Sequence, residues 1–366
     1  MAEVRVAQKK DKMDFYRLWK TCFGDSDAFC DWFFENRFSP AHSVVLEEKG
    51  EIPSCMQAFP YMIQIRGKEV PGAMLCGVST HPDHRKKGYM GKIFSFEMNH
   101  LRKMGAMVAV HTPAVLPSYF SFGHFPAADA AYLNCNVIPL LKKSENIYII
   151  NENRWKDLYP LYKKFAEKYC GIIKRSEADF LRKAADYAAD GGKSIAYIEN
   201  NTVEGYAFYY KTDTDLICIE AVAEDGYWEK LMEGLFTLGY GLKFSAKLPP
   251  EIEISCPFAT LERKQKGVMG LCNGPALLKA LEMDIPYCFK ISDPVVPENN
   301  GIFDFKGNIS SEQPVFELSA GHLLQVLVGY HSLDEIKNEI HIYDEVKWIE
   351  INTLLSKQNC YIIDEY

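Results

Sequence analysis

The sequence predicts a mixed α/β fold, in which central mixed sheets are flanked by helices. Three observations support this prediction. Amphipathic helical segments alternate with strand-like runs over residues 1 to about 140, the same style returns over residues 145–270, and the pattern changes again from about residue 285. A chain of 366 residues also exceeds what one hydrophobic core usually supports. We therefore expect three domains, over residues 1–142, 143–284 and 285–366.

Helices and strands alternate in the first predicted domain. Its helices carry apolar residues at helical spacing, and either Asp25 or Ser26 can cap the second of them. Charged turns that contain glycine divide a β-rich stretch into three runs. In order, we expect helices over 13–23 and 25–38, strands within 43–80 broken at 49–51 and 66–68, a helix over 90–104 and a strand over 106–110.

The other two predicted domains repeat this alternation with different elements. In the second, we expect helices over 154–169 and 177–190, a hairpin over 194–210, a strand over 215–222, a helix over 228–240 and a strand over 251–255. In the third, we expect strands over 286–292 and 301–305, helices over 319–328 and 348–356, and a strand over 360–363 near the chain end.

Composition places the chain among soluble proteins that are not exported. Hydrophobic residues make up 48% and charged residues 25%, no run of about 18 uncharged apolar residues occurs, and the amino terminus lacks a signal-like apolar stretch. The eleven cysteines are scattered without a C-x-x-C pair, which indicates reduced thiols in a cytoplasmic protein. A formal net charge of -8 suits a cationic substrate. We expect no nucleic acid and no membrane among the partners.

The loop after the third strand of the first domain has the features of an anion-binding site. The strand ends at Thr80, Pro82 prevents its continuation and an apolar helix begins near Met90, so the loop lies at a helix amino terminus, where anions bind. Free N–H groups of residues 87–91 can converge on a phosphate, and Gly88 permits backbone angles or close approaches that a side chain would forbid. Positive charge comes from Arg85, Lys86 and Lys87.

An ordinary solvated basic loop is the alternative interpretation of this segment, although the dinucleotide and P-loop fingerprints are absent from it. The segment resembles the coenzyme A signature of GNAT N-acetyltransferases, Q/R-x-x-G-x-G/A, with Arg85 and Gly88 in the first two fixed places and Met90 departing from the last. The resemblance implies acetyl-CoA as cosubstrate, and a preceding strand that splays open to bind the pantetheine arm. It assigns to acetyl-CoA the residues Val78, Ser79, Thr80, Arg85, Lys86, Lys87, Gly88, Tyr89, Met90 and Gly91.

A second resemblance covers nearly the whole chain. Residues 119–125, YFSFGHF, are similar to the Y-x-R-F-G-Y loop of the enhanced intracellular survival (Eis) acetyltransferases, with Ser121 in place of the Arg. Residues 269–281 resemble the segment before the third domain of that family, and residues 293–301 resemble its D-P-x-x-P-x-N-x-G start. The resemblance implies tandem GNAT folds, the second without the signature, followed by a sterol carrier protein-like α+β domain. That label concerns shape and does not imply sterol binding.

The Eis resemblance also implies two catalytic residues. Tyr119 corresponds to the general acid, which protonates the departing thiolate, and the terminal carboxylate of Tyr366 corresponds to the general base. The expected reaction is direct transfer of an acetyl group to a primary amine, either an aminoglycoside-like polyamine or a lysine side chain. A non-catalytic acyl-CoA sensor or scaffold protein is the alternative function. The resemblance leaves a homo-oligomer open.

Other histidines and carboxylates near these segments carry weaker indications. His81, Asp83 and His84 follow one another closely enough to suggest a metal site, but a solvated loop explains them, and we expect no metal. His111 and His124 flank the Tyr119 loop, where a satisfied structural histidine is the expected role for each and substrate contact is the alternative.

Overall fold

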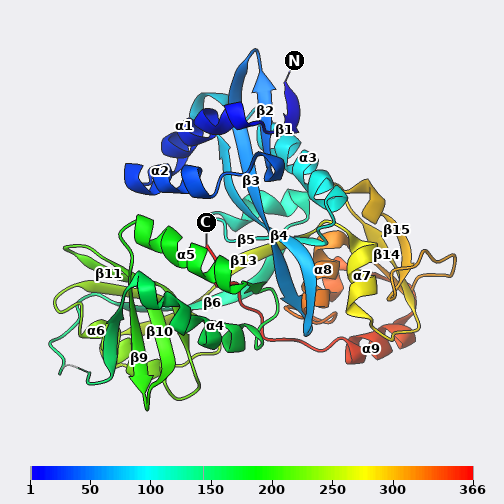
Figure 1. Ribbon diagram of the computed structural model, residues 1–366. Helices are drawn as coiled ribbons and strands as arrows, with labels where there is room; N and C mark the ends of the chain where they lie inside the picture. The colour runs from blue at the N-terminus through cyan, green and yellow to red at the C-terminus, as the bar shows by residue number, and fades with distance from the viewer. Residues whose placement is uncertain (1, 143, 366) are drawn as a thin grey trace. The chain divides into compact units, whose positions relative to one another are not determined.

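The computed structural model describes residues 2–142 and 144–365 (Figure 1). The chain divides into two compact units. Unit 1 comprises residues 1–128, 169–173 and 266–366, and unit 2 comprises residues 129–168 and 174–265. Both units combine a mixed sheet with helices, so the predicted mixed α/β fold class is confirmed. The division into three domains stays a prediction.

A sheet with the strand order β1–β2–β3–β4–β5–β13 is the centre of unit 1 (Figure 1). β4 and β5 are parallel, and the other neighbouring strands are antiparallel. The strands are β1 (Glu3–Val6), β2 (Ser43–Glu48), β3 (Glu51–Ile65), β4 (Lys68–Thr80), β5 (Val108–His111) and the part of β13 (Thr260–Leu271) from residue 266 onward.

Helices cover both faces of this sheet, because its strands are apolar on both sides. Along β2, Val45 belongs to the core under α1 (Lys12–Phe23) and α2 (Asp27–Asn36), whereas Val44 and Leu46 belong to the core under α3 (Tyr89–Lys103). Successive side chains of a strand point to opposite faces. The sheet therefore lies between α1 and α2 on one side and α3 on the other (Figure 1).

The start of α2 distinguishes between its two candidate capping residues. The hydroxyl of Ser26 accepts a hydrogen bond from the Phe29 backbone N–H at 3.1 Å, which is the geometry of a helix cap. Asp25 has another partner, since its carboxylate accepts from the Trp19 indole N–H at 2.6 Å. Ser26 is therefore the cap, and Asp25 ties the end of α1 to the loop that follows it.

The carboxy-terminal part of unit 1 has a second sheet, with the strand order β15–β14–β16–β17. Its apolar side chains belong to the same hydrophobic core as those of α1 and α2. Its strands are β14 (Cys288–Ser292), β15 (Gly301–Asp304), β16 (Phe316–Ser319) and β17 (His341–Ile342), and its helices are α7 (Gly274–Leu281), α8 (Ala320–Val328) and α9 (Glu345–Leu354).

Unit 2 contains a sheet with the strand order β6–β12–β11–β10–β9–β7. β11 and β12 are parallel, and the other pairs are antiparallel. The strands are β6 (Phe125–Cys135), which enters unit 2 at residue 129, β7 (Ile147–Ile150), β9 (Lys193–Glu199), β10 (Thr202–Lys211), β11 (Asp215–Ala223) and β12 (Lys243–Leu248). The helices are α4 (Tyr159–Ala166), α5 (Glu177–Ala189) and α6 (Trp228–Phe236).

Two of the strand predictions are wrong. Residues 251–255 form no strand, because β12 ends before Pro249 and Pro250, and proline has no N–H for a ladder. Residues 360–363 are buried, but among the described residues of this segment only Cys360 makes a β-bridge, to Cys170. This segment is therefore held by burial more than by a β-ladder.

Short elements complete the chain. They are β8 (Ile173–Lys174) and the 3-10 helices η1 (Lys9–Asp11), η2 (Pro40–His42), η3 (Pro82–His84), η4 (Leu116–Phe122), η5 (Glu152–Leu158), η6 (Pro297–Asn299) and η7 (Lys337–Glu339). All eleven cysteines are free thiols, and only Cys22 and Cys256 are not buried. None of the helices within 2–142 and 144–365 has the length and apolar character needed to cross a lipid bilayer.

Candidate functional site

The end of β4 separates from β5 in unit 1. The parallel ladder joins Gly72, Ala73 and Met74 to residues 108–110, while β4 continues to Thr80. On its other edge, β4 stays paired with β3 as far as Thr80. The backbone groups of β4 beyond Met74 therefore have one edge that no described strand covers, and a ligand can use their hydrogen-bonding capacity.

A β-bulge bends β4 at the point where it separates. Gly77 and Val78 together oppose Met56 of β3, because the register passes from Gln57–Cys76 to Cys55–Ser79. Gly77 has φ of +59°, and a Cβ added there would lie 2.6 Å from the Trp19 ring. Only glycine meets both constraints without strain, so Gly77 allows the bend that opens this edge.

The loop after β4 leads into the amino terminus of α3. Gly88 is the residue before the helix and has φ of +74°, a backbone angle that favours glycine. Its carbonyl oxygen accepts the first helical hydrogen bond, from the Lys92 N–H at 3.3 Å. The N–H groups of residues 89–91 precede that bond and have no partner within the helix. They form an anion-binding terminus at the open end of β4.

A cleft of about 640 Å³ connects the open edge of β4 with this helix terminus. Every residue that the sequence assigns to acetyl-CoA lines it except Lys87, whose ammonium group lies 3.4 Å from His84 Nδ1. The Tyr89 hydroxyl donates a hydrogen bond to Glu48 at 2.5 Å. Tyr89 therefore offers its backbone and ring to the cleft. The lining residues are Cys22, Phe23, Val78, Ser79, Thr80, His84, Arg85, Lys86, Gly88, Tyr89, Met90, Gly91 and Phe122.

Tyr119 lies on η4, the turn that also carries Phe122 of the cleft lining. Phe94 of α3 joins the two, because its ring centroid is 4.8 Å from that of Phe122 and 5.7 Å from that of Tyr119. Tyr119 is half-buried, and burial raises the pKa of its phenol above the usual value near 10. The phenol is therefore in its protonated, proton-donating form at neutral pH.

Behind Tyr119 lies a buried pair of imidazoles. The His111 ring makes an edge contact with the Tyr119 ring at 4.5 Å, and His111 Nε2 lies 3.0 Å from His124 Nδ1. Burial lowers the pKa of His111 well below 6.5, and burial lowers that of His124 to about 3. Both rings are therefore neutral at pH 7, and one donates its N–H to the other.

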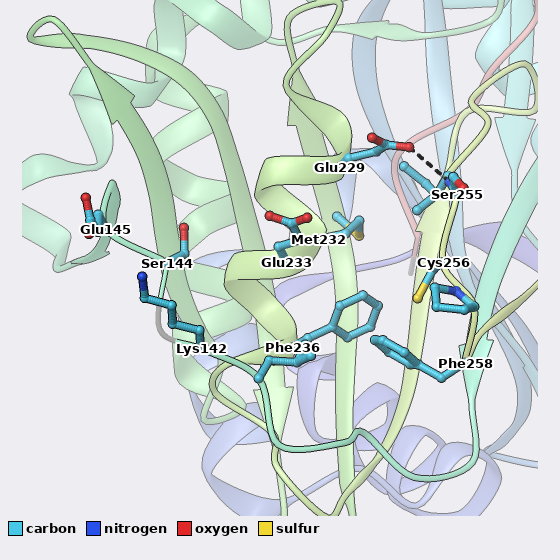
Figure 2. Close-up of a pocket in the computed structure, with 13 residues that line it drawn as sticks. Lys142, Ser144, Glu145, Glu229, Met232, Glu233, Phe236, Ser255, Cys256 and Phe258 are labelled. Atoms are coloured by element: carbon cyan, nitrogen blue, oxygen red, sulfur yellow. Dashed lines mark hydrogen bonds between the residues drawn. The ribbon is translucent and has the colours of Figure 1, made fainter.

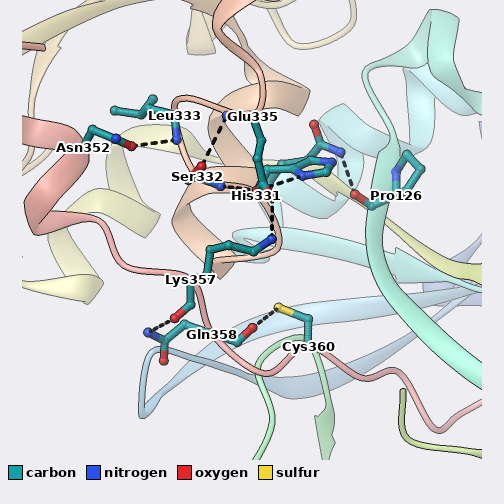
Figure 3. Close-up of polar contacts among 10 residues, drawn as sticks. Pro126, His331, Ser332, Leu333, Glu335, Asn352, Lys357, Gln358 and Cys360 are labelled. Carbon is teal, nitrogen blue, oxygen red and sulfur yellow. Dashed lines mark hydrogen bonds and ion pairs between the residues drawn. The ribbon is translucent and has the colours of Figure 1, made fainter. Parts of the chain in front are cut away.

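The carboxy-terminal segment is tied to unit 1 before it reaches this region. The Gln358 N–H donates to Gly329 O at 2.8 Å. Lys357 donates to Glu335 at 2.7 Å (Figure 3). The bond from Lys357 lowers the pKa of Glu335 to about 2. Further along, the Thr112 hydroxyl donates to Asp364 O at 3.3 Å. Tyr366, the predicted base, lies outside the described residues.

The residues first considered for a metal site do not converge. His81 Nδ1 accepts from the Asp83 N–H at 3.3 Å, and His84 Nδ1 faces Lys87. Across the described residues, no group of three or more His, Cys, Asp or Glu side chains is arranged to hold a metal ion.

Residues 3–127, which contain the bulge, the cleft and Tyr119, match the family described as "Acetyltransferase (GNAT) domain". Unit 1 therefore contains a GNAT acetyltransferase domain. That domain makes the protein an enzyme of the N-acetyltransferase type, and acyl-CoA is the cosubstrate of this family. No curated protein matches the chain in sequence.

Solved structures resemble the GNAT enzyme over its full length. A conserved protein of unknown function from Enterococcus faecalis V583, termed a probable N-acyltransferase, has a TM-score of 0.80 at 17% identity. A GCN5-related N-acetyltransferase from Anabaena variabilis has 0.82 at 13%, and Eis1 from Mycobacterium abscessus has 0.78 at 14%. Each comparison covers 100% of both chains. At these identities the likeness is one of fold.

Several residues of the GNAT site carry no separate signal in the sequence. Gly77 is an ordinary glycine in an apolar run, and only the register with β3 reveals the bulge. Phe94 and Phe122 look like core residues until their rings are seen between the cleft and Tyr119. Cys22 and Phe23 come from α1, far from the loop in sequence, and line the same cleft.

Proposed function

We propose that the protein transfers an acetyl group from acetyl-CoA to a primary amine. The observation that carries this proposal is the open edge of β4, which leads directly into the amino terminus of α3. Tyr119 lies close to it, because the Phe94 ring contacts both Tyr119 and Phe122 of the cleft lining. This arrangement offers three things to a thioester of coenzyme A: an open strand edge, an anion-binding helix terminus and a phenol.

The residues present suit acetyl-CoA. The N–H groups of residues 89–91 and the side chains of Arg85 and Lys86 supply donors for the pyrophosphate. The open edge of β4 supplies amides for the pantetheine arm, and a β4 amide near Val78 is suited to polarise the thioester carbonyl. Met90, which occupies the place of a small residue in the signature, lines the cleft without closing it.

In the proposed reaction, a neutral amine nitrogen attacks the thioester carbonyl carbon, a C–N bond forms and the C–S bond breaks. The departing thiolate takes its proton from the Tyr119 hydroxyl, and the attacking nitrogen loses its proton to the terminal carboxylate of Tyr366. The raised pKa of Tyr119 keeps it protonated for this step. The bond from Thr112 to Asp364 supports the proposed role of Tyr366, because it holds Asp364, two residues earlier in the chain, beside the residue that follows His111, and His111 contacts Tyr119.

The finer assignments belong to the same proposal. An aminoglycoside-like polyamine or a lysine side chain is the proposed acceptor, and the net charge of -8 suits either cation. The sheet of β14–β17 with α8 and α9 supports a sterol carrier protein-like domain of an Eis-like enzyme. Eleven free thiols agree with a reducing, cytoplasmic compartment. The proposal includes a homo-oligomer, and measurement of the mass of the protein in solution tests it.

The test is acetyl-CoA turnover with a panel of amines: an aminoglycoside, spermidine and a lysine-containing peptide. We expect at least one to be acetylated, and Tyr119→Phe to lower kcat by about 100-fold, the usual scale of general acid catalysis, while the Kd of acetyl-CoA changes little. Tyr240→Phe, at a tyrosine that is 67% exposed, is the matched control. Binding of acetyl-CoA without turnover of any amine would favour the sensor, and absence of binding would reject both functions.

A further inference from the structure

A second cavity lies in unit 2 and shares no residue with the acetyl-CoA cleft. It has a volume of about 450 Å³ and lies between α6 and the loop of residues 254–258 (Figure 2). Cavities of this size hold small organic molecules. We propose that it binds an organic cation with an apolar body, such as an aryl or alkyl ammonium compound. This inference does not depend on the proposed acetyl transfer.

The inner wall of the cavity is apolar and aromatic. Met232 and Phe236 are buried on α6, and Phe258 faces them from the opposite loop (Figure 2). The rings of Phe236 and Phe258 meet edge to face, with centroids 5.1 Å apart. These side chains offer contact area to hydrocarbon and ring faces to a cation.

Carboxylates surround the mouth of this cavity. Glu145, Glu229 and Glu233 line it and are exposed, and Lys142 is the cation among the described lining residues. Glu229 accepts a hydrogen bond from the Ser255 N–H at 3.1 Å, which fixes one carboxylate at the edge. Within the described residues, no cation lies within ion-pair distance of Glu229 or Glu233. Among the described residues, the mouth therefore carries more negative than positive charge.

The apolar wall and the negative mouth of the cavity together favour one class of ligand over three others. A purely apolar compound would leave the carboxylates unused, and an anion would be repelled by them. A compact cation without a hydrocarbon body would not fill the apolar interior. A cation on an apolar body meets both surfaces, with its charge beside Glu233 and its body against Phe236 and Phe258.

Benzyltrimethylammonium is the probe, because it is permanently charged and has no N–H group to be acetylated. Isothermal titration calorimetry should give saturable binding with a Kd of about 0.1–1 mM, the range expected for a ligand of this size. We expect Glu233→Gln to weaken binding by about 5-fold, and the double variant E229Q/E233Q by more. Glu262→Gln, which removes an exposed carboxylate of unit 2 paired with Lys264, should leave the Kd unchanged.

The location of the bound probe is tested by thiol alkylation. Cys256 lines this cavity and Cys22 lines the acetyl-CoA cleft, and these are the two cysteines that are not buried. The probe should slow iodoacetamide modification of Cys256, measured by peptide mass spectrometry, and leave Cys22 unaffected.

Three results would overturn the proposal. The first is absence of saturable binding. The second is an affinity that does not depend on charge, so that benzyl alcohol binds as tightly as the probe or E229Q/E233Q binds the probe as tightly as wild type. The third is binding of the probe without protection of Cys256. Unchanged thermal unfolding of the variants ensures that a loss of binding reflects the lost carboxylates.

Discussion

The hydroxyl of Thr112 donates a hydrogen bond to the carbonyl oxygen of Asp364 across 3.3 Å. Thr112 directly follows His111, the last residue of β5, and the His111 ring contacts Tyr119. The Asp364 side chain is buried, and the next residue, Glu365, pairs with Lys266 at 3.3 Å. Residues 364 and 365 are thus held by several contacts close to Tyr119, the proposed general acid.

A carboxy-terminal extension tests this relationship. Adding Gly-Ser after Tyr366 replaces its carboxylate by an amide and moves the charge, so kcat should fall by about 100-fold, whereas the Kd of acetyl-CoA should stay within about 2-fold. Steady-state acetylation and calorimetry measure the two quantities. The same dipeptide added before residue 1 is the control. Wild-type turnover in the extended protein would remove Tyr366 from the mechanism.

The bulge at Gly77 leads to a prediction about stability and cosubstrate binding together. Gly77→Ala introduces a strained positive φ and a Cβ 2.6 Å from the Trp19 ring. Gly50→Ala is a matched control, since Gly50 also has positive φ but open space around it. We expect Gly50→Ala to cost about 1 kcal/mol of unfolding free energy and Gly77→Ala about 2 kcal/mol or more.

Acetyl-CoA affinity should separate the same two variants. Because the bulge opens the edge of β4, Gly77→Ala should weaken binding, and Gly50→Ala should not. Urea denaturation and calorimetric titration provide the measurements. Equal losses of stability in the two proteins would show that the Trp19 contact does not constrain residue 77.

Glu97 predicts a pH dependence of stability. It is fully buried on α3, neither of its carboxylate oxygens has a hydrogen-bond partner among the described residues, and burial raises its pKa from 4.5 to about 8. Between these values the folded state keeps a proton that the unfolded state loses, so stability falls as pH rises from about 4.5 to about 8.

Glu97→Gln should remove that dependence, because the amide does not ionise. The variant should be more stable than wild type at pH 8 by on the order of 2–4 kcal/mol, and the difference should vanish near pH 4.5. Chemical denaturation at several pH values measures this difference, with Glu51→Gln at an exposed position of β3 as the control. A constant difference at every pH would mean that Glu97 is already ionised in the folded protein.

Local patterns predicted the structure of the loop that we propose binds acetyl-CoA, because its signals lie close together in the sequence. Pro82 ends the strand, Gly88 adopts positive φ and the helix begins one residue later. In contrast, no strand was predicted for β12 or β13. KFSAKL of β12 and TLERKQ in the first half of β13 contain several charged residues and become strands only through their partners. The pattern EIEIS over 251–255 alternates like a strand and has no partner to pair with.

The proposed catalytic half of the site was less accessible to sequence reasoning. Tyr119 was identified only through a family resemblance, and the stacking of Phe94 on Phe122 and the imidazole pair behind Tyr119 depend on tertiary packing. Such contacts join residues on different elements, and periodicity reports only the face of an element that is buried.

Gly270 and His124 provide the last prediction. Gly270 lies on β13, and a Cβ added there would be 1.8 Å from His124 Nε2, so the imidazole occupies the space that any larger residue would need. Gly270→Ala should therefore destabilise the protein by about 3 kcal/mol or more, through overpacking of a buried site. His124→Ala should also destabilise it, because it leaves a cavity and removes the partner of His111.

The double variant G270A/H124A distinguishes this contact from two independent losses. Since the alanine methyl group at 270 enters the space vacated by the imidazole, the double variant should be more stable than the sum of the single losses predicts, by about 1–3 kcal/mol. Urea denaturation of the four proteins completes the cycle. Additive losses would mean that β13 moves away from His124 to accept the methyl group, and that the imidazole pair does not depend on a glycine at 270.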